Sequence, residues 1–199
     1  VLLNLAAYII LFGMLYGAVM GSFGGFAGER LWQVLYSALK VPLLLLCTFA
    51  ISLPSFFVLN SLFGLRDDFG QAIRSLAATQ AGLAIVLSSL APFTALWYLS
   101  TDYYNVAYLF NGCMFAIASF AAQRLLRHYY RSLIEKNLRH RYLLWLWVVI
   151  YAFVGIQMGW VLRPFIGDPS LEVQFFREGD WGNAYVVVFN GIWGVLTGR

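Results

Sequence analysis

Five long stretches of the chain contain no Asp, Glu, Lys or Arg, and hydrophobic residues dominate each of them. Every stretch is at least 21 residues long. A helix rises about 1.5 Å per residue, so about 20 apolar residues cross a hydrocarbon core of about 30 Å. The pattern therefore predicts an all-α fold, an integral membrane bundle of five transmembrane helices. The predicted spans cover residues 5–22, 41–64, 73–99, 103–122 and 142–162.

Two further segments have the periodicity of amphipathic helices. Residues 29–40 place Leu31, Val34 and Leu35 on one helical face and Gln33, Ser37 and Lys40 over much of the rest. This pattern predicts an interfacial helix at the membrane surface, or a helix that packs on the spans. Residues 184–196 also repeat aromatic and aliphatic side chains at helical spacing, but this run is too short to span comfortably. We predict a second interfacial helix there, and a sixth span over residues 181–198 is the alternative.

Basic residues set the predicted orientation. Six of them fall in residues 123–141, where only Glu135 opposes them, and the positive-inside rule places such a segment in the cytoplasm. We therefore predict a transmembrane domain over residues 1–165 that begins in the cytoplasm and contains a cytoplasmic basic hairpin at 123–141. Residues 166–199 form the predicted extracytoplasmic tail, and a bacterial cytoplasmic membrane is the expected location. The six basic residues are Arg124, Arg127, Arg131, Lys136, Arg139 and Arg141.

The composition fits a membrane protein and argues against other classes. Hydrophobic residues make up 61% and charged residues 11% of the 199, whereas a soluble domain is about 25% charged. The net charge of +4 is small, and the basic segment does not indicate nucleic-acid binding. The simpler interpretation of that segment is a topology determinant. The alternative is contact with anionic lipid headgroups, at about 1 kcal/mol per Lys or Arg.

Four glycines recur at a spacing of four residues near the start of the chain: Gly13, Gly17, Gly21 and Gly25. On a helix this spacing gives a smooth ridge that lets a second backbone approach closely, and such contacts drive helix association in lipid. The ridge is expected to pack against another span of the same chain, or to form an interface with another membrane subunit.

Residues that carry chemistry are missing from the predicted spans. Apart from Arg74 at the very start of the third span, the spans contain no Asp, Glu, His, Lys or Arg, which intramembrane ion and proton pathways usually need. The chain has no phosphate-binding or dinucleotide motif and no zinc-protease motif. We therefore predict no catalytic residue, no metal site and no cofactor. Gln80, Asn111 and Gln157 are expected to join helices by hydrogen bonds, at about 0.6–2 kcal/mol each.

Loop residues give weaker signals. Asp67 and Asp68 are predicted to form a helix-capping turn, and His128 and His140 to be solvated. Arg163 and Asp168 bracket a Pro-Phe-Ile-Gly segment and are expected to pair locally, or Arg163 reaches toward headgroups. A partner site on the outer face is the alternative, and its predicted contacts are Arg163, Phe175, Phe176, Trp181 and Tyr185.

The segment Leu-Phe-Gly-Leu-Arg-Asp-Asp-Phe-Gly-Gln-Ala at residues 62–72 ends one predicted span and opens the next. It resembles the inter-span loop of Yip1-like membrane proteins, where an apolar helix ends in Gly and a Phe-x-Gln-Ala turn begins the next. The five-span arrangement, which begins inside and ends outside, is similar as well, and the likeness covers residues 41–163. The resemblance implies membrane organisation or trafficking-type scaffolding and carries over no catalytic residues. The glycine ridge, the helix at 29–40 and the aromatic tail depart from that family.

The function predicted from these observations is a non-enzymatic membrane scaffold or an accessory subunit of a larger assembly. Its partners would be membrane lipids and other membrane protein subunits. The alternative is a passive transporter or lipid-handling protein built around helix kinks at Pro54 and Pro92.

Overall fold

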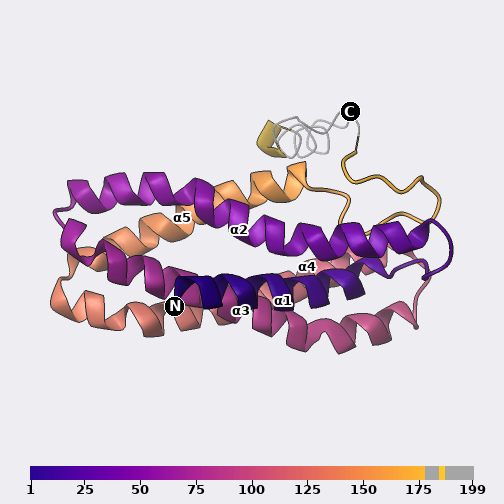
Figure 1. The fold of residues 1–199 in the computed structure, drawn as a ribbon, viewed down its shortest axis with the longest axis horizontal. Coiled ribbons are helices and arrows are strands. Elements are labelled where there is room, and N and C mark those ends of the chain that lie inside the picture. The colour runs from indigo at the N-terminus through magenta and orange to yellow at the C-terminus, as the bar shows by residue number, and fades with distance from the viewer. Residues whose placement is uncertain (178–183, 187–199) are drawn as a thin grey trace, which may run out of the picture.

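The computed structural model describes residues 1–177 and 184–186, and these fold into a bundle of five long helices (Figure 1). Helix α1 packs against α2 and α3, α3 packs against α4, and α2 packs against α5. By length and composition, all five helices are able to cross a membrane. The elements are α1 (Leu2–Gly21), α2 (Arg30–Leu62), the 3-10 turn η1 (Arg66–Asp68), α3 (Phe69–Tyr98), α4 (Tyr104–Lys136) and α5 (Arg139–Val161).

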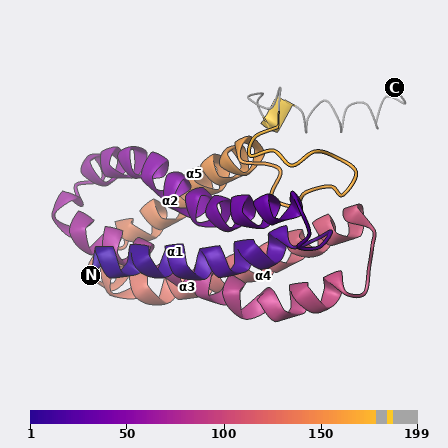
Figure 2. The same cartoon turned by 45° about the vertical axis from the view of Figure 1, so that its right-hand side comes forward.

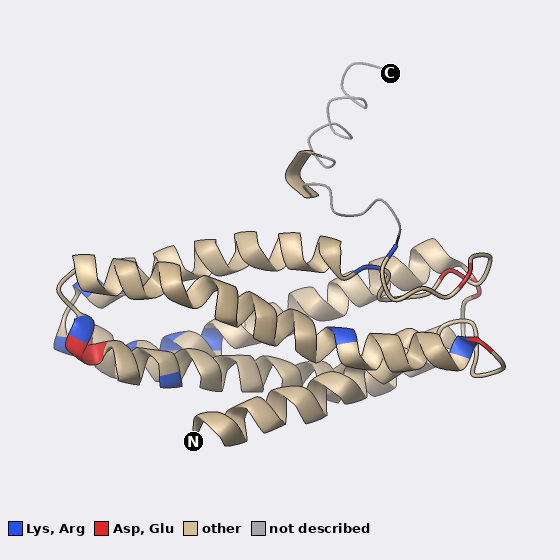
Figure 3. Cartoon of the chain, turned by 45° about the horizontal axis from the view of Figure 1, so that its top comes forward, with Lys and Arg blue, Asp and Glu red and all other residues tan. Residues whose placement is uncertain are grey.

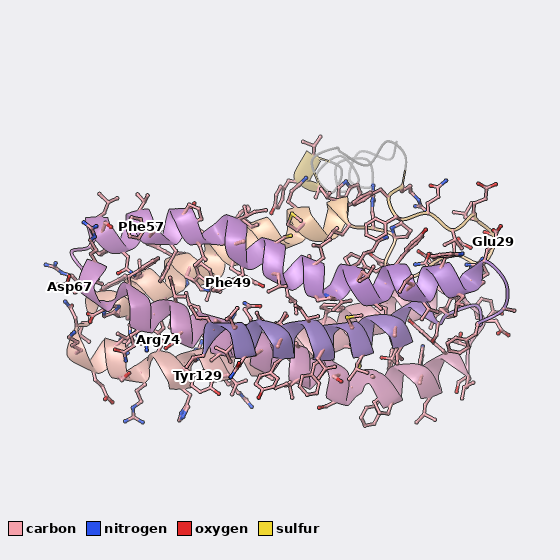
Figure 4. All side chains as sticks on the ribbon, viewed as in Figure 1. Glu29, Phe49, Phe57, Asp67, Arg74 and Tyr129 are labelled. Carbon is pink, nitrogen blue, oxygen red and sulfur yellow. The ribbon has the colours of Figure 1, made fainter. Side chains whose placement is uncertain are left out.

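The helices run along one long axis and the chain reverses at two ends (Figures 1 and 2). Figure 4 labels Glu29 at one end and Asp67 at the other, and we name the ends after these residues. The Glu29 end holds the connections at 22–29 and 99–103 and the segment that follows α5. The Asp67 end holds η1 and the turn between α4 and α5. Figure 3 shows Lys, Arg, Asp and Glu gathered mostly toward these ends, while most of each helix is uncharged.

Helix α2 corrects one prediction. Residues 30–40 are not a separate interfacial helix: they form the first third of a continuous 33-residue helix. No Gly or Pro lies between Arg30 and Val41, so nothing in the local sequence ends the helix there. Pro42 and Pro54 both lie inside α2 without ending it. At about 1.5 Å per residue the helix is about 50 Å long, well beyond the thickness of a hydrocarbon core.

The other long helices follow the predictions more closely. Helix α4 continues past its predicted span to Lys136, and α5 begins at Arg139 after a short turn. Residues 65–74 lie beside the predicted basic hairpin at 123–141, at the Asp67 end: Lys136 Nζ donates to Asp68 and Arg139 Nη1 donates to the Phe63 carbonyl. The predicted tail helix and the alternative sixth span fall outside the described residues, apart from a helical turn at Ala184–Val186.

Two buried clusters form the core. One contains Tyr16, Leu87 and Met114 between α1, α3 and α4, and the other contains Phe56, Leu76 and Trp147 toward the Asp67 end. Uncharged polar residues join helices inside the bundle, as predicted for Asn111 and Gln80. Three of these bonds run from Tyr16 Oη to Asn111 Oδ1 at 3.0 Å, from Asn111 Nδ2 to Tyr98 Oη at 2.6 Å and from Tyr151 Oη to Gln80 Oε1 at 2.8 Å.

Candidate functional site

The start of α2 is amphipathic with its polar face buried in the protein. Gln33, Ser37 and Lys40 are fully buried, whereas Leu31 and Trp32 are 59% and 57% exposed. The polar face of this helix points into the protein and its apolar face points outward. A helix at a water surface has the reverse arrangement. The observed arrangement is the one expected of a helix that faces lipid on one side and polar protein groups on the other.

The buried polar stripe binds the segment that follows α5. Gln33 Nε2 donates to the Phe165 carbonyl at 3.3 Å, and Ser37 Oγ donates to the same oxygen. Arg30 Nη2 donates to the Asp168 carbonyl at 2.9 Å. From α4, Tyr104 Oη adds a bond of 3.2 Å to the Ile166 carbonyl. Side chains of two helices therefore satisfy backbone carbonyls that no regular secondary structure pairs.

Lys40 is the most unusual member of this stripe because its side chain is fully buried. Its Nζ donates to the Pro164 carbonyl at 2.6 Å and lies 4.9 Å from the centre of the Phe175 ring. Both contacts attract an ammonium group, the first through a charge-assisted hydrogen bond and the second through the ring quadrupole. Pro164 lies just beyond the carboxyl end of α5, where the helix dipole also favours a cation.

Residues 162–168 are held inside the Glu29 end as a plug. Leu162, Ile166 and Gly167 are buried, and Ile166 belongs to the core cluster between α1, α3 and α4. A Cβ on Gly167 would lie 2.8 Å from the Gln33 side chain, so a larger residue here would require that buried amide to shift. We call residues 162–168 the plug.

Residues 169–177 cover the plug and present a mixed surface. Leu171 and Phe176 are 52% and 42% exposed, while the Phe175 ring packs edge-on against Tyr36 at 5.2 Å. A cavity of about 310 Å³ lies beneath this surface, and Gln33, Pro164, Gly167, Asp168, Leu171, Glu172, Gln174 and Arg177 line it. We call residues 169–177 the cap segment.

Asp168 fixes the turn between the plug and the cap segment. Its Oδ1 accepts bonds from the Ser170 hydroxyl at 2.7 Å and the Ser170 amide at 2.9 Å. These bonds, the hydroxyl first, hold the pKa of the Asp168 carboxyl below its usual range. The carboxylate therefore stays charged at neutral pH and keeps the turn closed.

The predicted tail contacts are placed in different surroundings. Arg163 stacks over the Trp160 ring at 3.1 Å, and Phe175 and Phe176 lie in the cap segment. Tyr185 donates to the Phe153 carbonyl and its ring lies 5.3 Å from that of Phe153, which ties residues 184–186 to α5. Trp181 lies outside the described residues.

The glycine ridge faces α2 of the same chain. A Cβ on Gly17 would come within 2.3 Å of the Ser37 carbonyl oxygen, and one on Gly21 within 2.7 Å of the Ser37 side chain. Gly13 is 3.2 Å from Pro42 by the same measure. Gly25 lies beyond α1 in a turn with a φ of +97°, so it is not part of the ridge. The ridge brings α1 against the very part of α2 that holds the plug.

Several of the six basic residues at the Asp67 end already have partners. Arg131 pairs with Glu135 at 2.7 Å and Lys136 with Asp68. Arg139 Nη1 lies 3.3 Å from the Phe63 carbonyl, and the Arg124 guanidinium stacks 4.6 Å from the Phe120 ring centre. Arg127 and Arg141 are exposed and make no ion pair within the described part of the chain.

His140 and Asp68 correct two further predictions. His140 is fully buried, not solvated, and its Nε2 lies 3.1 Å from Asp68 Oδ2, whereas His128 is exposed as expected. Asp68 stands at the start of α3 but its carboxylate does not cap that helix. It faces Lys136 and His140 because the turn after α4 brings both beside η1.

The sequence interpretation missed the plug and the residues that hold it. Arg30, Gln33, Ser37 and Lys40 have the spacing of one helical face. The prediction of an interfacial helix turns that face toward water because it separates segment 29–40 from the following span, whereas the alternative of a helix that packs on the spans does not. The uninterrupted helical pattern from Arg30 to Val41 is the signal that was available. No family model, no curated protein and no solved structure matches the chain.

Proposed function

We propose that the chain is an integral membrane protein that acts as a scaffold or accessory subunit of a larger membrane assembly and has no catalytic role. The cap segment is its proposed contact surface for another membrane protein. In this proposal the Asp67 end faces the cytoplasm, because it carries most of the basic residues.

The observation that carries the proposal is the fixed position of the plug beneath the cap segment. Polar side chains of α2 and α4 hold the carbonyls of Pro164, Phe165, Ile166 and Asp168, so the plug beneath the cap segment is anchored at four backbone positions. A recognition surface gains affinity when its backbone is held in place before binding.

The contacts of Lys40 favour a structural role for this lysine over a role in an ion or substrate pathway. An ionisable residue within a membrane helix usually marks an ion or substrate pathway. Here the ammonium is directed at a backbone carbonyl and an aromatic ring of the plug and cap segment. The charged group of Lys40 therefore holds the plug and the cap segment against α2.

The experiment is a comparison of the native size of gently solubilised protein from wild type and from Lys40→Met. The scaffold proposal predicts that the wild-type chain migrates with a defined partner and that Lys40→Met migrates alone although its own fold is intact. Leu39→Met is the matched control, since Leu39 is exposed on the adjacent position of the same helix. A wild-type chain that runs as a lone monomer would sink the proposal.

A lipid-handling or passive transport function is the alternative. It predicts that the purified chain in lipid vesicles accelerates lipid transfer or solute uptake above the background leak. The same vesicles with Pro54→Ala should then show a weaker effect, because Pro54 removes a backbone hydrogen bond in α2.

A further inference from the structure

A second cavity lies at the Asp67 end, on the surface between α3 and α4. Its volume is about 370 Å³, and Gln71, Arg74, Ser75, Ala78 and Tyr129 line it. Figure 4 shows Arg74 and Tyr129 on neighbouring helices at the same level of the bundle. A bond of 3.1 Å from Gln71 Nε2 to Ser132 Oγ joins the two helices beside it. We call this cavity the α3–α4 groove.

Apart from Ala78, the side chains that line the α3–α4 groove carry hydrogen-bond donors, and none of them is a carboxylate. Arg74 uses Nε to bond the Gly70 carbonyl at 3.1 Å, which orients the guanidinium and leaves its two terminal nitrogens for another acceptor. Tyr129 adds an exposed phenol hydroxyl and Gln71 an amide. A cavity with these groups is complementary to an anion that has several acceptor oxygens.

The nearby carboxylates lie outside the groove, and Asp67 is exposed to solvent and makes no ion pair with Arg74. Glu135 is paired with Arg131, and Asp68 is paired with Lys136 and His140. Arg74 makes no ion pair within the residues that the structure describes. The local field therefore favours an anion in the groove.

The position of the groove along α3 and α4 indicates which class of anion it would meet. Arg74 is the last charged residue before the uncharged stretch of α3, and Arg124 is the first one after the uncharged stretch of α4. The groove thus lies where the apolar part of the bundle meets its charged end. In a bilayer this is the level of the phosphate groups of the lipids.

We propose that the α3–α4 groove binds the phosphate group of an anionic glycerophospholipid. Arg74 offers two parallel donors to phosphate oxygens, and Tyr129 and Gln71 contact a further oxygen. The acyl chains continue along the apolar surface of α3 and α4, where Ile85, Ile117 and Phe120 are exposed. This site differs from the basic residues predicted from the sequence, because its arginine comes from α3 and its other donors meet only in the folded bundle.

The test measures binding of short-chain phosphatidic acid to the detergent-solubilised full chain by native mass spectrometry, with phosphatidylcholine of the same acyl length as the neutral comparison. Wild type is expected to bind phosphatidic acid about tenfold more tightly than phosphatidylcholine. Arg74→Gln is expected to remove that preference, and Tyr129→Phe to reduce it severalfold. Arg141→Gln is the matched control, since Arg141 is exposed at the same end and does not line the groove.

Three results would overturn the proposal. If Arg74→Gln and Arg141→Gln weakened phosphatidic acid binding equally, the lipid would be attracted by positive charge in general and not by a specific site. Equal binding of the two lipids by wild type would mean that the groove does not recognise phosphate charge. Displacement of phosphatidic acid by equal concentrations of inorganic phosphate or glycerol 3-phosphate would assign the groove to a free phosphate compound. Arg74 and Arg141 are both exposed, so neither substitution is expected to disturb folding. Circular dichroism of the two variants checks this.

Discussion

The Nζ of Lys40 lies 2.6 Å from the carbonyl oxygen of Pro164 and joins the first third of α2 to the segment that follows α5, 124 residues later. A lysine with no exposed surface is costly to bury, and a methionine of similar length would avoid that cost. The contact therefore holds the plug in place without necessarily adding to the stability of the bundle.

Lys40→Met is accordingly predicted to loosen the plug while leaving the bundle folded. The change removes one charge-assisted hydrogen bond, worth about 1.5–3 kcal/mol, and relieves the burial of a charge. Hydrogen–deuterium exchange across residues 162–177 should rise about tenfold or more, with the thermal midpoint nearly unchanged. Leu39→Met should alter neither measurement, and a bundle that unfolds in Lys40→Met would show that Lys40 supports the whole fold.

Gly17→Ala is predicted to destabilise the protein by about 1–3 kcal/mol because the added methyl overlaps the α2 backbone. The nearest atoms are the Ser37 carbonyl oxygen and the Ala38 Cα, at 2.3 Å and 2.8 Å, and neither is able to rotate away. Thermal unfolding in one detergent measures the effect. Gly112→Ala is the control: nothing lies within 4 Å of its Cβ position, so improved helix propensity should make it neutral or stabilising. Equal behaviour of the two variants would contradict the close packing of α1 on α2.

The hydrogen bonds around Asn111 are predicted to couple α1, α3 and α4. A double-mutant cycle between Tyr16→Phe and Asn111→Ala should give an interaction free energy of about 0.6–1.7 kcal/mol, the range of bonds between helices in lipid. Reversible unfolding of the four proteins in mixed micelles supplies the values. Tyr108→Phe is a comparison because Tyr108 is exposed on α4. Additive effects of the two changes would mean that the bond is absent in the folded protein.

His140 and His128 are predicted to respond differently to the same substitution. His140→Gln should lower the free energy of unfolding by about 1–3 kcal/mol, since it disturbs the buried contact with Asp68 and the packing beside Tyr130. His128→Gln should change it by less than about 0.5 kcal/mol because His128 is exposed. Urea unfolding with a spectroscopic probe measures the free energy of unfolding of both variants. Similar losses for both would mean that His140 is solvated, as the sequence predicts.

The five long helices could be predicted from the sequence because the absence of charge over more than 20 residues is a one-dimensional signal. The sequence leaves two alternatives for the glycine ridge: packing against another span of the same chain or against another membrane subunit. The spacing of the glycines shows that a second backbone can approach, but it does not show which backbone does so. The buried polar stripe of α2 was not predictable in the same way. Gln33, Ser37 and Lys40 become interior residues because residues 162–168 return to them from far along the chain and α1 packs against Ser37.

The α3–α4 groove illustrates the same limit for the candidate sites. Sequence selected a run of basic residues, but folding pairs Arg131 and Lys136 with carboxylates. Arg74 and Tyr129 are 55 positions apart in the chain, and nothing in either segment indicates that they line one cavity. Charge is visible in a sequence, whereas the pairing of charges is a property of the packed helices.

Site-specific photo-crosslinking in native membranes is the most direct test of the scaffold proposal. A photoreactive residue at Phe176, exposed in the cap segment, should link to another membrane protein in wild type and lose that product in Lys40→Met. The same residue at Phe93, exposed on α3, should link to lipid in both backgrounds. Products from Phe176 that contain only lipid or the chain itself would contradict the proposal that the cap segment is a contact surface for a partner.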